Sequence, residues 1–211
     1  MENSAPERED VRRLASLSDG VIAFAMTLLV IDLARPAQGT IANAANLHAA
    51  LAQGSAYASF ALSFAVIALY WNAHYKTFRR LLRVDRTVLT LNLVFLFGIT
   101  FLPFPTAILQ RFSGFRAAVM LYAGTLAAIG LVWAVLWNHA ATSGLFSDDR
   151  DQRGELLDVL EAPIVFLISM AIAWFSPNWS IRSWLLIIVV GRTRAMLSHR
   201  HRPPTEPTSI T

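Results

Sequence analysis

Long apolar segments alternate with short polar segments along most of this chain. A helix that crosses a bilayer needs about 20 mostly apolar residues, and six segments approach or exceed that length. The pattern therefore predicts an all-α protein with six membrane-spanning helices, at 12–34, 47–75, 87–109, 116–140, 160–176 and 180–198.

Proline positions refine these boundaries. Pro103 and Pro105 fall inside the third predicted helix, where a missing backbone N–H is expected to kink or end it. Pro177 closes the fifth helix. We interpret residues 1–198 as a single membrane domain and the Pro-rich residues 199–211 as a disordered cytoplasmic tail.

Composition agrees with a membrane location. The chain is 55% hydrophobic and only 15% charged, with a mean hydropathy of +0.47, whereas soluble domains carry about 25% charged residues. Cysteine is absent, which excludes disulfides and thiolate metal sites. The first ten residues are mixed and acidic, so we expect the first helix to be retained rather than cleaved as a signal.

The distribution of positive charge predicts the orientation. With the N-terminus inside, 14 of the 18 lysines and arginines fall in inner segments, and the other 4 are Arg35, Arg111, Arg116 and Arg182. This bias predicts that both termini are cytoplasmic. It also places the basic charge at the inner membrane face, so nucleic acid is not needed to explain it.

The first predicted helix begins with polar residues. At 1.5 Å per residue, 12–34 is roughly 34 Å long, whereas a helix from Val21 would be only roughly 20 Å. Ser18 and Asp19 therefore belong to the helix, near the inner membrane boundary. A carboxylate there is costly without a partner. Asp19 either caps or braces helices, or serves as an ion ligand or proton carrier.

An apolar stripe follows on the same helix. Phe24, Leu28 and Ile31 repeat at helical spacing and share one face, with Thr27 beside them. At 100° per residue, Asp19 lies about 140° from Phe24 and points into the rest of its own subunit. By spacing alone such a stripe is typical of helix packing.

Several motifs resemble one family. Arg13-Leu14-Ala15-Ser16-Leu17-Ser18-Asp19 resembles the R-x-x-x-F-S-D signature of the transmembrane protein 175 family, potassium channels that lack a P-loop. The similarity continues in the GVIAFAMTLLVIDL segment and at four further places: Trp71-x-x-His74, Asp85, Asn92 and Leu102-Pro103-Phe104-x-Thr106.

The resemblance implies a homotetramer in which four copies of the first helix surround a central pore. The family selects ions with apolar rings, whose positions correspond here to Phe24, Leu28 and Ile31, while Thr27 occupies the position of a hydroxyl layer. Leu17 replaces the motif phenylalanine, and Phe24 replaces the usual isoleucine. Four phenylalanines at this level would narrow the pore, close it, or change how a cation is dehydrated.

The resemblance also implies a polar network of Arg13, Ser18 and Asp19 with His74. On the residues alone, His74 is either a hydrogen-bonded interface residue or a titrating group that tunes opening. Trp71 fits an interfacial anchor or a packing residue. Arg13 lies about 20° from the apolar stripe on an ideal helix, so the helix start is irregular, or Arg13 reaches around it, or it lines the inner mouth.

Other motifs point to no further chemistry. The sequence contains no P-loop filter, Walker motif, zinc-protease motif or nucleophile elbow. The acidic cluster near residue 150 is interleaved with arginines and fits a solvated helix start better than a metal site. Trp137-Asn138-His139 partly repeats the Trp71–His74 grouping, which we interpret as chance with interfacial preference.

The sequence thus predicts a multi-pass homotetrameric potassium channel of a bacterial inner membrane, with passive conduction. We expect no enzyme activity, no cofactor, no bound metal and no nucleic-acid partner; its partners would be copies of itself, lipid and monovalent cations. A proton-coupled transporter or proton pathway using Asp19 and His74 is an alternative. A non-conducting scaffold is another alternative. An intramembrane enzyme would need convergent polar groups at membrane depth, and the sequence offers too few of them.

Overall fold

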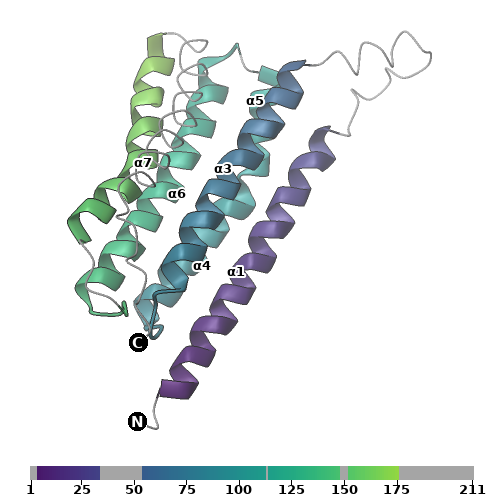
Figure 1. Ribbon diagram of the computed structural model, residues 1–211. Helices are drawn as coiled ribbons and strands as arrows, with labels where there is room; N and C mark the ends of the chain where they lie inside the picture. The colour runs from purple at the N-terminus through teal and green to yellow at the C-terminus, as the bar shows by residue number, and fades with distance from the viewer. Residues whose placement is uncertain (1–3, 34–53, 113, 148–151, 176–211) are drawn as a thin grey trace, which may run out of the picture.

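The computed structural model describes residues 4–33, 54–112, 114–147 and 152–175. These ranges are almost entirely helical, as predicted, and contain no strand. The helices are α1 (Ser4–Leu33), α3 (Gly54–Phe78), α4 (Arg86–Phe101), α5 (Pro103–Phe112), α6 (Arg116–Thr142) and α7 (Gln152–Phe175) (Figure 1).

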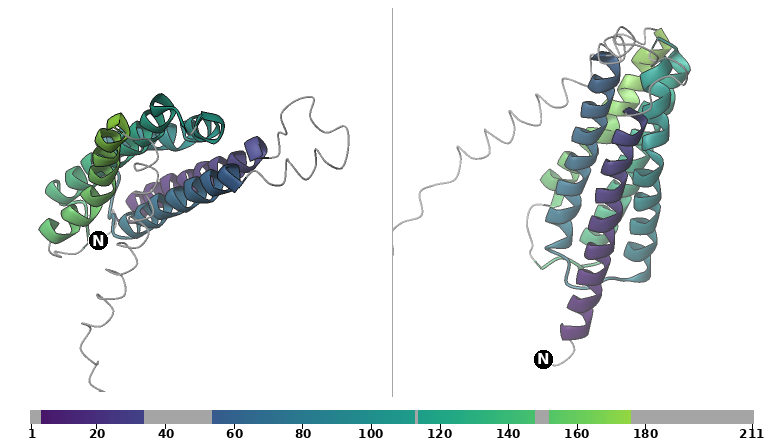
Figure 2. Two further views of the ribbon diagram at one scale, coloured as in Figure 1. Left: turned by 90° about the horizontal axis from the view of Figure 1, so that it is seen from above. Right: turned by 90° about the vertical axis from the view of Figure 1, so that its right-hand side faces the viewer.

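The helices form a bundle with α1 and α7 on opposite sides (Figures 1 and 2). α1 packs against α3, α4 and α5, whereas α6 packs against α4, α5 and α7. The N-terminal end of α1 extends past the ends of its neighbours (Figure 1). Only part of α1 is therefore in contact with the rest of the chain.

The third predicted helix is divided into α4 and α5, as its prolines indicated. Pro103 has no N–H to continue the α-helical ladder. The backbone tightens just before it, where the Leu102 N–H bonds to the Ile99 carbonyl at 3.3 Å. The Thr106 N–H then bonds to the Leu102 carbonyl at 3.1 Å and restarts the helix.

The start of α1 differs from the prediction. The helix begins at Ser4 rather than at residue 12. The Glu9 carboxylate accepts hydrogen bonds from Arg12 and Arg13, one helical turn later. Such pairs at three- and four-residue spacing support a helix in solvent, so the charged segment continues the apolar one.

α7 begins at Gln152, earlier than the predicted 160, and keeps Pro163 inside the helix. The described part of α3 runs from Gly54 to Phe78, and the first residues of the predicted helix 47–75 lie outside the described residues. The sixth predicted helix (180–198), the predicted tail (199–211) and most of the acidic cluster near residue 150 lie outside the described residues.

Two helix ends are closed by local hydrogen bonds. Asp85 caps α4 by accepting from the Val88 N–H at 2.7 Å. After α6, Gly144 adopts a φ of 62°, and the Leu145 N–H bonds to the Ala140 carbonyl at 3.0 Å. This arrangement is a Schellman motif, in which glycine supplies the left-handed residue.

The loops at this end of the bundle are joined to each other. The Leu82 N–H bonds to the Leu145 carbonyl, and the Ser147 N–H bonds to the Arg80 carbonyl, each at 2.9 Å. The loop between α3 and α4 is therefore fixed against the segment that follows α6.

Four described helical segments are long and apolar enough to cross a membrane. They are Pro6–Ile31, Ala56–Phe78, Arg86–Phe112 and Arg116–Thr142, while Val159–Trp174 is apolar but shorter. These four segments correspond to the first four predicted helices, and Val159–Trp174 corresponds to the fifth. The chain is thus a helical membrane protein.

Candidate functional site

α1 has one buried face and one exposed face. The buried face contacts the bundle through Val11, Leu14, Ser18, Ile22, Ala25 and Leu29. Phe24 and Ile31 point elsewhere and are 61% and 47% exposed, while Leu28 is half-buried and Thr27 is exposed. The predicted stripe therefore lies on a face that no described helix covers.

A shallow groove of about 410 Å³ lies at the N-terminal start of this stripe. Leu17, Gly20 and Phe24 of α1 line it together with Thr100 of α4. Its walls are almost wholly apolar and belong to two segments that are long and apolar enough to cross a membrane, Pro6–Ile31 and Arg86–Phe112. The groove leaves Phe24 accessible from outside the subunit.

Thr27 does not present a free hydroxyl donor along this face. Its hydroxyl donates to the Phe24 carbonyl of the same helix at 2.7 Å. The oxygen retains acceptor capacity toward a cation, because a hydroxyl has two lone pairs.

A directed chain of hydrogen bonds connects α1, α4 and α3. The His74 Nε2–H donates to the Asn92 Oδ1 at 3.0 Å, and the Asn92 Nδ2 donates to the Ser18 Oγ at 3.0 Å. The Ser18 hydroxyl donates in turn to the Leu14 carbonyl at 2.8 Å. All three side chains are buried. Because Asn92 Oδ1 only accepts, the geometry requires the His74 proton on Nε2.

Aromatic rings surround His74 on the other sides. Its ring stacks on Phe78 with centroids 4.0 Å apart and on Phe95 at 5.9 Å, and it lies 5.5 Å from Trp133. The imidazole is thus held by packing as well as by Asn92.

Asp19 and Arg13 lie outside this chain of bonds. Asp19 accepts from the Trp71 Nε1–H at 2.8 Å, and Trp71 stacks on Tyr75 at 5.7 Å. Asp19 thus connects α1 to α3 through Trp71. Arg13 is exposed and donates to Glu9 at 3.2 Å. The structure brings Ser18, His74, Asp19 and Trp71 to one α1–α3–α4 junction, and it does not bring Arg13 there.

Asn92 is the central residue of the junction, and the sequence analysis did not give it this role. It appeared there only as one matching position in the resemblance. A single asparagine in an apolar segment is a signal in principle, because a buried amide in a membrane helix requires partners.

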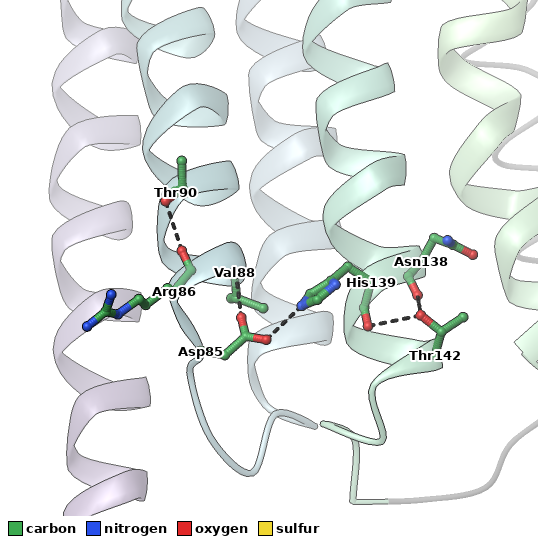
Figure 3. Close-up of polar contacts among 7 residues, drawn as sticks. All are labelled: Asp85, Arg86, Val88, Thr90, Asn138, His139 and Thr142. Atoms are coloured by element: carbon green, nitrogen blue, oxygen red, sulfur yellow. Dashed lines mark hydrogen bonds and ion pairs between the residues drawn. The ribbon is translucent and has the colours of Figure 1, made fainter.

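A second polar contact joins α4 to α6. The His139 Nε2–H donates to the Asp85 Oδ2 at 2.7 Å, beside the capping bond to Val88 (Figure 3). Burial acts to raise the pKa of the Asp85 carboxyl. Hydrogen bonds from Val88 and His139 outweigh that effect and hold the pKa below its ordinary value. The grouping that includes His139 therefore has a structural role that its sequence did not indicate.

This contact predicts a pH-dependent stability. A carboxyl with a depressed pKa stabilises the fold above its unfolded pKa, and the stabilisation is lost as pH falls through the folded value. We expect Asp85→Asn, which keeps the cap, to lower the melting temperature at pH 7 by a few degrees. Because the folded pKa of Asp85 lies below its ordinary value of 3.8, this difference should begin to shrink only below about pH 4 and should shrink further as the pH falls. Thermal unfolding of detergent-solubilised protein from pH 7 down to about pH 2 measures the trend. Asp10→Asn, on an exposed turn of α1, is the matched control; a difference as large at the lowest pH as at pH 7 would contradict the assignment.

A further buried polar cluster lies between α3, α5 and α6. The Ser63 hydroxyl contacts the hydroxyls of Thr106 and Tyr122, each at 3.0 Å. The Tyr70 hydroxyl donates to the Leu126 carbonyl at 2.9 Å. These bonds satisfy hydroxyl groups inside the bundle, where water is absent.

Within the part of the chain that the structure describes, no three His, Asp or Glu side chains gather as metal ligands. The described features are a helical membrane bundle, an uncovered apolar face on its first helix, and a polar junction that holds that helix. These features define an integral membrane protein of the α-helical class.

Comparison with known proteins identifies the family. The family model for the endosomal/lysosomal potassium channel TMEM175 matches residues 13–103. The chain is 32% identical over 179 residues to potassium channel Cha6605_3372 of Chamaesiphon minutus, covering 82% of this chain and 88% of that one. The chain therefore belongs to the TMEM175 family, which is a family of ion channels and not of enzymes.

A solved structure and a more distant relative complete the comparison. The crystal structure of a lysosomal potassium-selective channel TMEM175 homolog from Chamaesiphon minutus superposes with a TM-score of 0.78 at 29% identity. The superposition covers 88% of this chain and 98% of the crystallised homolog's chain. The endosomal/lysosomal proton channel TMEM175 of Danio rerio is 25% identical over 144 residues, covering 68% of this chain and 27% of that protein.

Proposed function

We propose that this protein is a potassium-selective or potassium-preferring channel, and that the conducting pore is formed by α1 from four copies of the chain. The bacterial relative that covers most of the chain is named a potassium channel. The structurally similar homolog is described as potassium-selective. Both support passive potassium conduction here.

The uncovered apolar face of α1 is the observation that carries the proposal. Phe24 at 61% exposure and Ile31 at 47% leave large apolar side chains without partners inside the subunit. Four such faces around one axis would cover each other and leave a narrow apolar passage. Phe24, Leu28 and Ile31 would form successive rings, and Thr27 would add a polar layer. Apolar constrictions of this kind gate by dewetting.

The polar junction would hold α1 in register beside the pore. Ser18 reaches His74 through Asn92, and Asp19 bonds to Trp71, so two contacts fix α1 to α3 and α4 near the inner boundary. We assign Ser18, Asp19, Trp71 and His74 to this bracing role. Arg13 is exposed and lies about 20° from Phe24 on an ideal helix, so it would stand at the inner mouth of the proposed pore.

The charge distribution supports the topology that we propose for the full chain. It has six membrane helices, with 180–198 as the last, both termini in the cytoplasm, and a location in the bacterial inner membrane. Residues 1–198 would form the channel domain and 199–211 a cytoplasmic tail.

A proton pathway is the second candidate. The Danio rerio relative is named a proton channel, and Asp19 and His74 carry titratable groups near one end of α1. The contacts of His74 with Asn92 and Phe78 favour a structural imidazole instead.

Ion flux in liposomes tests the proposal. Purified protein is reconstituted, and flux is followed under a potassium gradient and then under a sodium gradient, with a protonophore to relieve charge build-up. We expect potassium flux several times greater than sodium flux. Equal fluxes would mean a non-selective cation pore. Flux that persists only with a proton gradient, and is lost in Asp19→Asn, would favour the proton pathway.

A further inference from the structure

A basic pocket of about 470 Å³ lies at the end of the bundle where α1 begins and α3 ends. Four arginines line this basic pocket, Arg8, Arg12, Arg79 and Arg80. Asp19 is the one carboxylate among the described residues that line it, and Trp71 already donates to that group. Arg12 is already paired with Glu9, but the three other arginines still outnumber the one lining carboxylate, so the pocket carries an excess of positive charge.

Local contacts position two of these arginines. The Arg79 guanidinium carbon lies 5.5 Å from the centre of the Tyr75 ring, and that of Arg80 lies 4.8 Å from the centre of the Phe146 ring. The Ser147 N–H bonds to the Arg80 carbonyl and fixes the loop. Cation–π contacts and a braced backbone reduce the entropy that the two side chains would lose when they bind an anion.

The rest of the basic pocket is lined mainly by apolar residues, together with His74, Tyr75 and Ser147. Val11, Ala15, Phe78 and Leu82 contribute to it. The membrane-spanning segments Pro6–Ile31 and Ala56–Phe78 both have one end here. The pocket thus places guanidinium groups next to apolar surface at a membrane boundary, on the side that the positive-inside rule assigns to the cytoplasm.

We propose that the basic pocket binds the phosphate group of an anionic glycerophospholipid. Guanidinium groups bind phosphate oxygens with paired hydrogen bonds, and basic pockets between membrane helices on the cytoplasmic side suit anionic headgroups. The apolar wall accommodates the glycerol and the first part of the acyl chains. A soluble anion would gain nothing from that wall, so the lipid fits better than free phosphate. The assignment goes beyond ion conduction and does not depend on it.

Lipid binding to the purified full-length protein tests this assignment. Protein in an uncharged detergent is titrated with short-chain phosphatidylglycerol, short-chain phosphatidylcholine and inorganic phosphate, and bound ligand is counted by native mass spectrometry. The pocket variant is Arg8→Gln with Arg79→Gln. The matched control is Arg83→Gln with Arg86→Gln, which removes the same charge from residues outside the pocket lining.

We expect phosphatidylglycerol to bind more tightly than phosphatidylcholine, and the pocket variant to lose about tenfold in affinity, equivalent to about 1.4 kcal/mol. The control should bind as the parent does. If inorganic phosphate binds as tightly as the lipid, the lipid assignment is overturned in favour of a soluble anion. Equal binding of the two lipids, or equal losses in pocket variant and control, would overturn it as well.

Arg8 and Arg79 are exposed, so both variants are expected to fold. Gel filtration checks this, and Arg79→Gln alone serves if the double variant aggregates. Because binding is read without ion flux, a failure of the pocket assignment leaves the proposed channel function unaffected, and the reverse also holds.

Discussion

Phe24→Ala is expected to raise ion conductance strongly and to move the potassium-to-sodium permeability ratio toward one. If four copies of Phe24 form the proposed ring, each phenylalanine removed would widen the pore at that level and admit water that a cation retains. A barrier lowered by about 1.4 kcal/mol raises the rate about tenfold. Single-channel recording in planar bilayers measures the conductance, and reversal potentials under mixed potassium and sodium gradients measure the selectivity.

Phe97→Ala is the matched control for this experiment. Phe97 lies on α4 and is 71% exposed, more than Phe24. The Phe97→Ala substitution makes the same reduction in side-chain size on an exposed surface outside α1. Conductance and selectivity should therefore stay at parental values. If Phe24→Ala also behaves like the parent, α1 does not supply the constriction and the pore must be sought on another helix.

Hydrophobic periodicity predicted the helical fold well, because each membrane helix is specified within its own segment. The apolar length sets the span, Pro103 sets the break between α4 and α5, and the stripe of Phe24, Leu28 and Ile31 follows from helical spacing. The start of α1 was predicted too late, since the pairing of Glu9 with Arg12 adds helix outside the apolar segment.

Contacts between helices were much harder to predict. Ser18 and Asn92 are 74 positions apart, and Asp85 and His139 are 54 apart. No periodicity within one helix specifies which polar residue on another helix faces it. The resemblance grouped Arg13 with His74, but Arg13 is directed to Glu9 and Asn92 is the residue that connects to His74.

Asn92→Leu is expected to be the most destabilising single change at the polar junction. Asn92 is 0% exposed and makes two bonds to other helices, to His74 and to Ser18. Each interhelical hydrogen bond in a membrane contributes about 0.6–2 kcal/mol, and the His74 Nε2–H would be left buried without an acceptor, which costs about 1–3 kcal/mol. We expect a total loss of about 2–4 kcal/mol and a marked fall in the yield of folded oligomer.

The size of the loss should depend on which partner remains. Ser18→Ala should cost only about 1 kcal/mol, because Asn92 keeps its bond to His74, whereas His74→Ala should cost more, because stacking on Phe78 is lost too. Thr90→Val, also on α4 but with an exposed hydroxyl bonded to its own helix, is the control and should be near neutral.

Retention of the gel-filtration peak after heating ranks these variants, and a double-mutant cycle between Ser18 and Asn92 isolates their coupling. Additive effects of Ser18→Ala and Asn92→Leu would mean that the two side chains do not share a bond. A coupling of about 1 kcal/mol or more is what the 3.0 Å contact between the Asn92 Nδ2 and the Ser18 Oγ requires. If coupling is present while potassium flux survives at reduced protein yield, the junction holds α1 in place and takes no direct part in conduction.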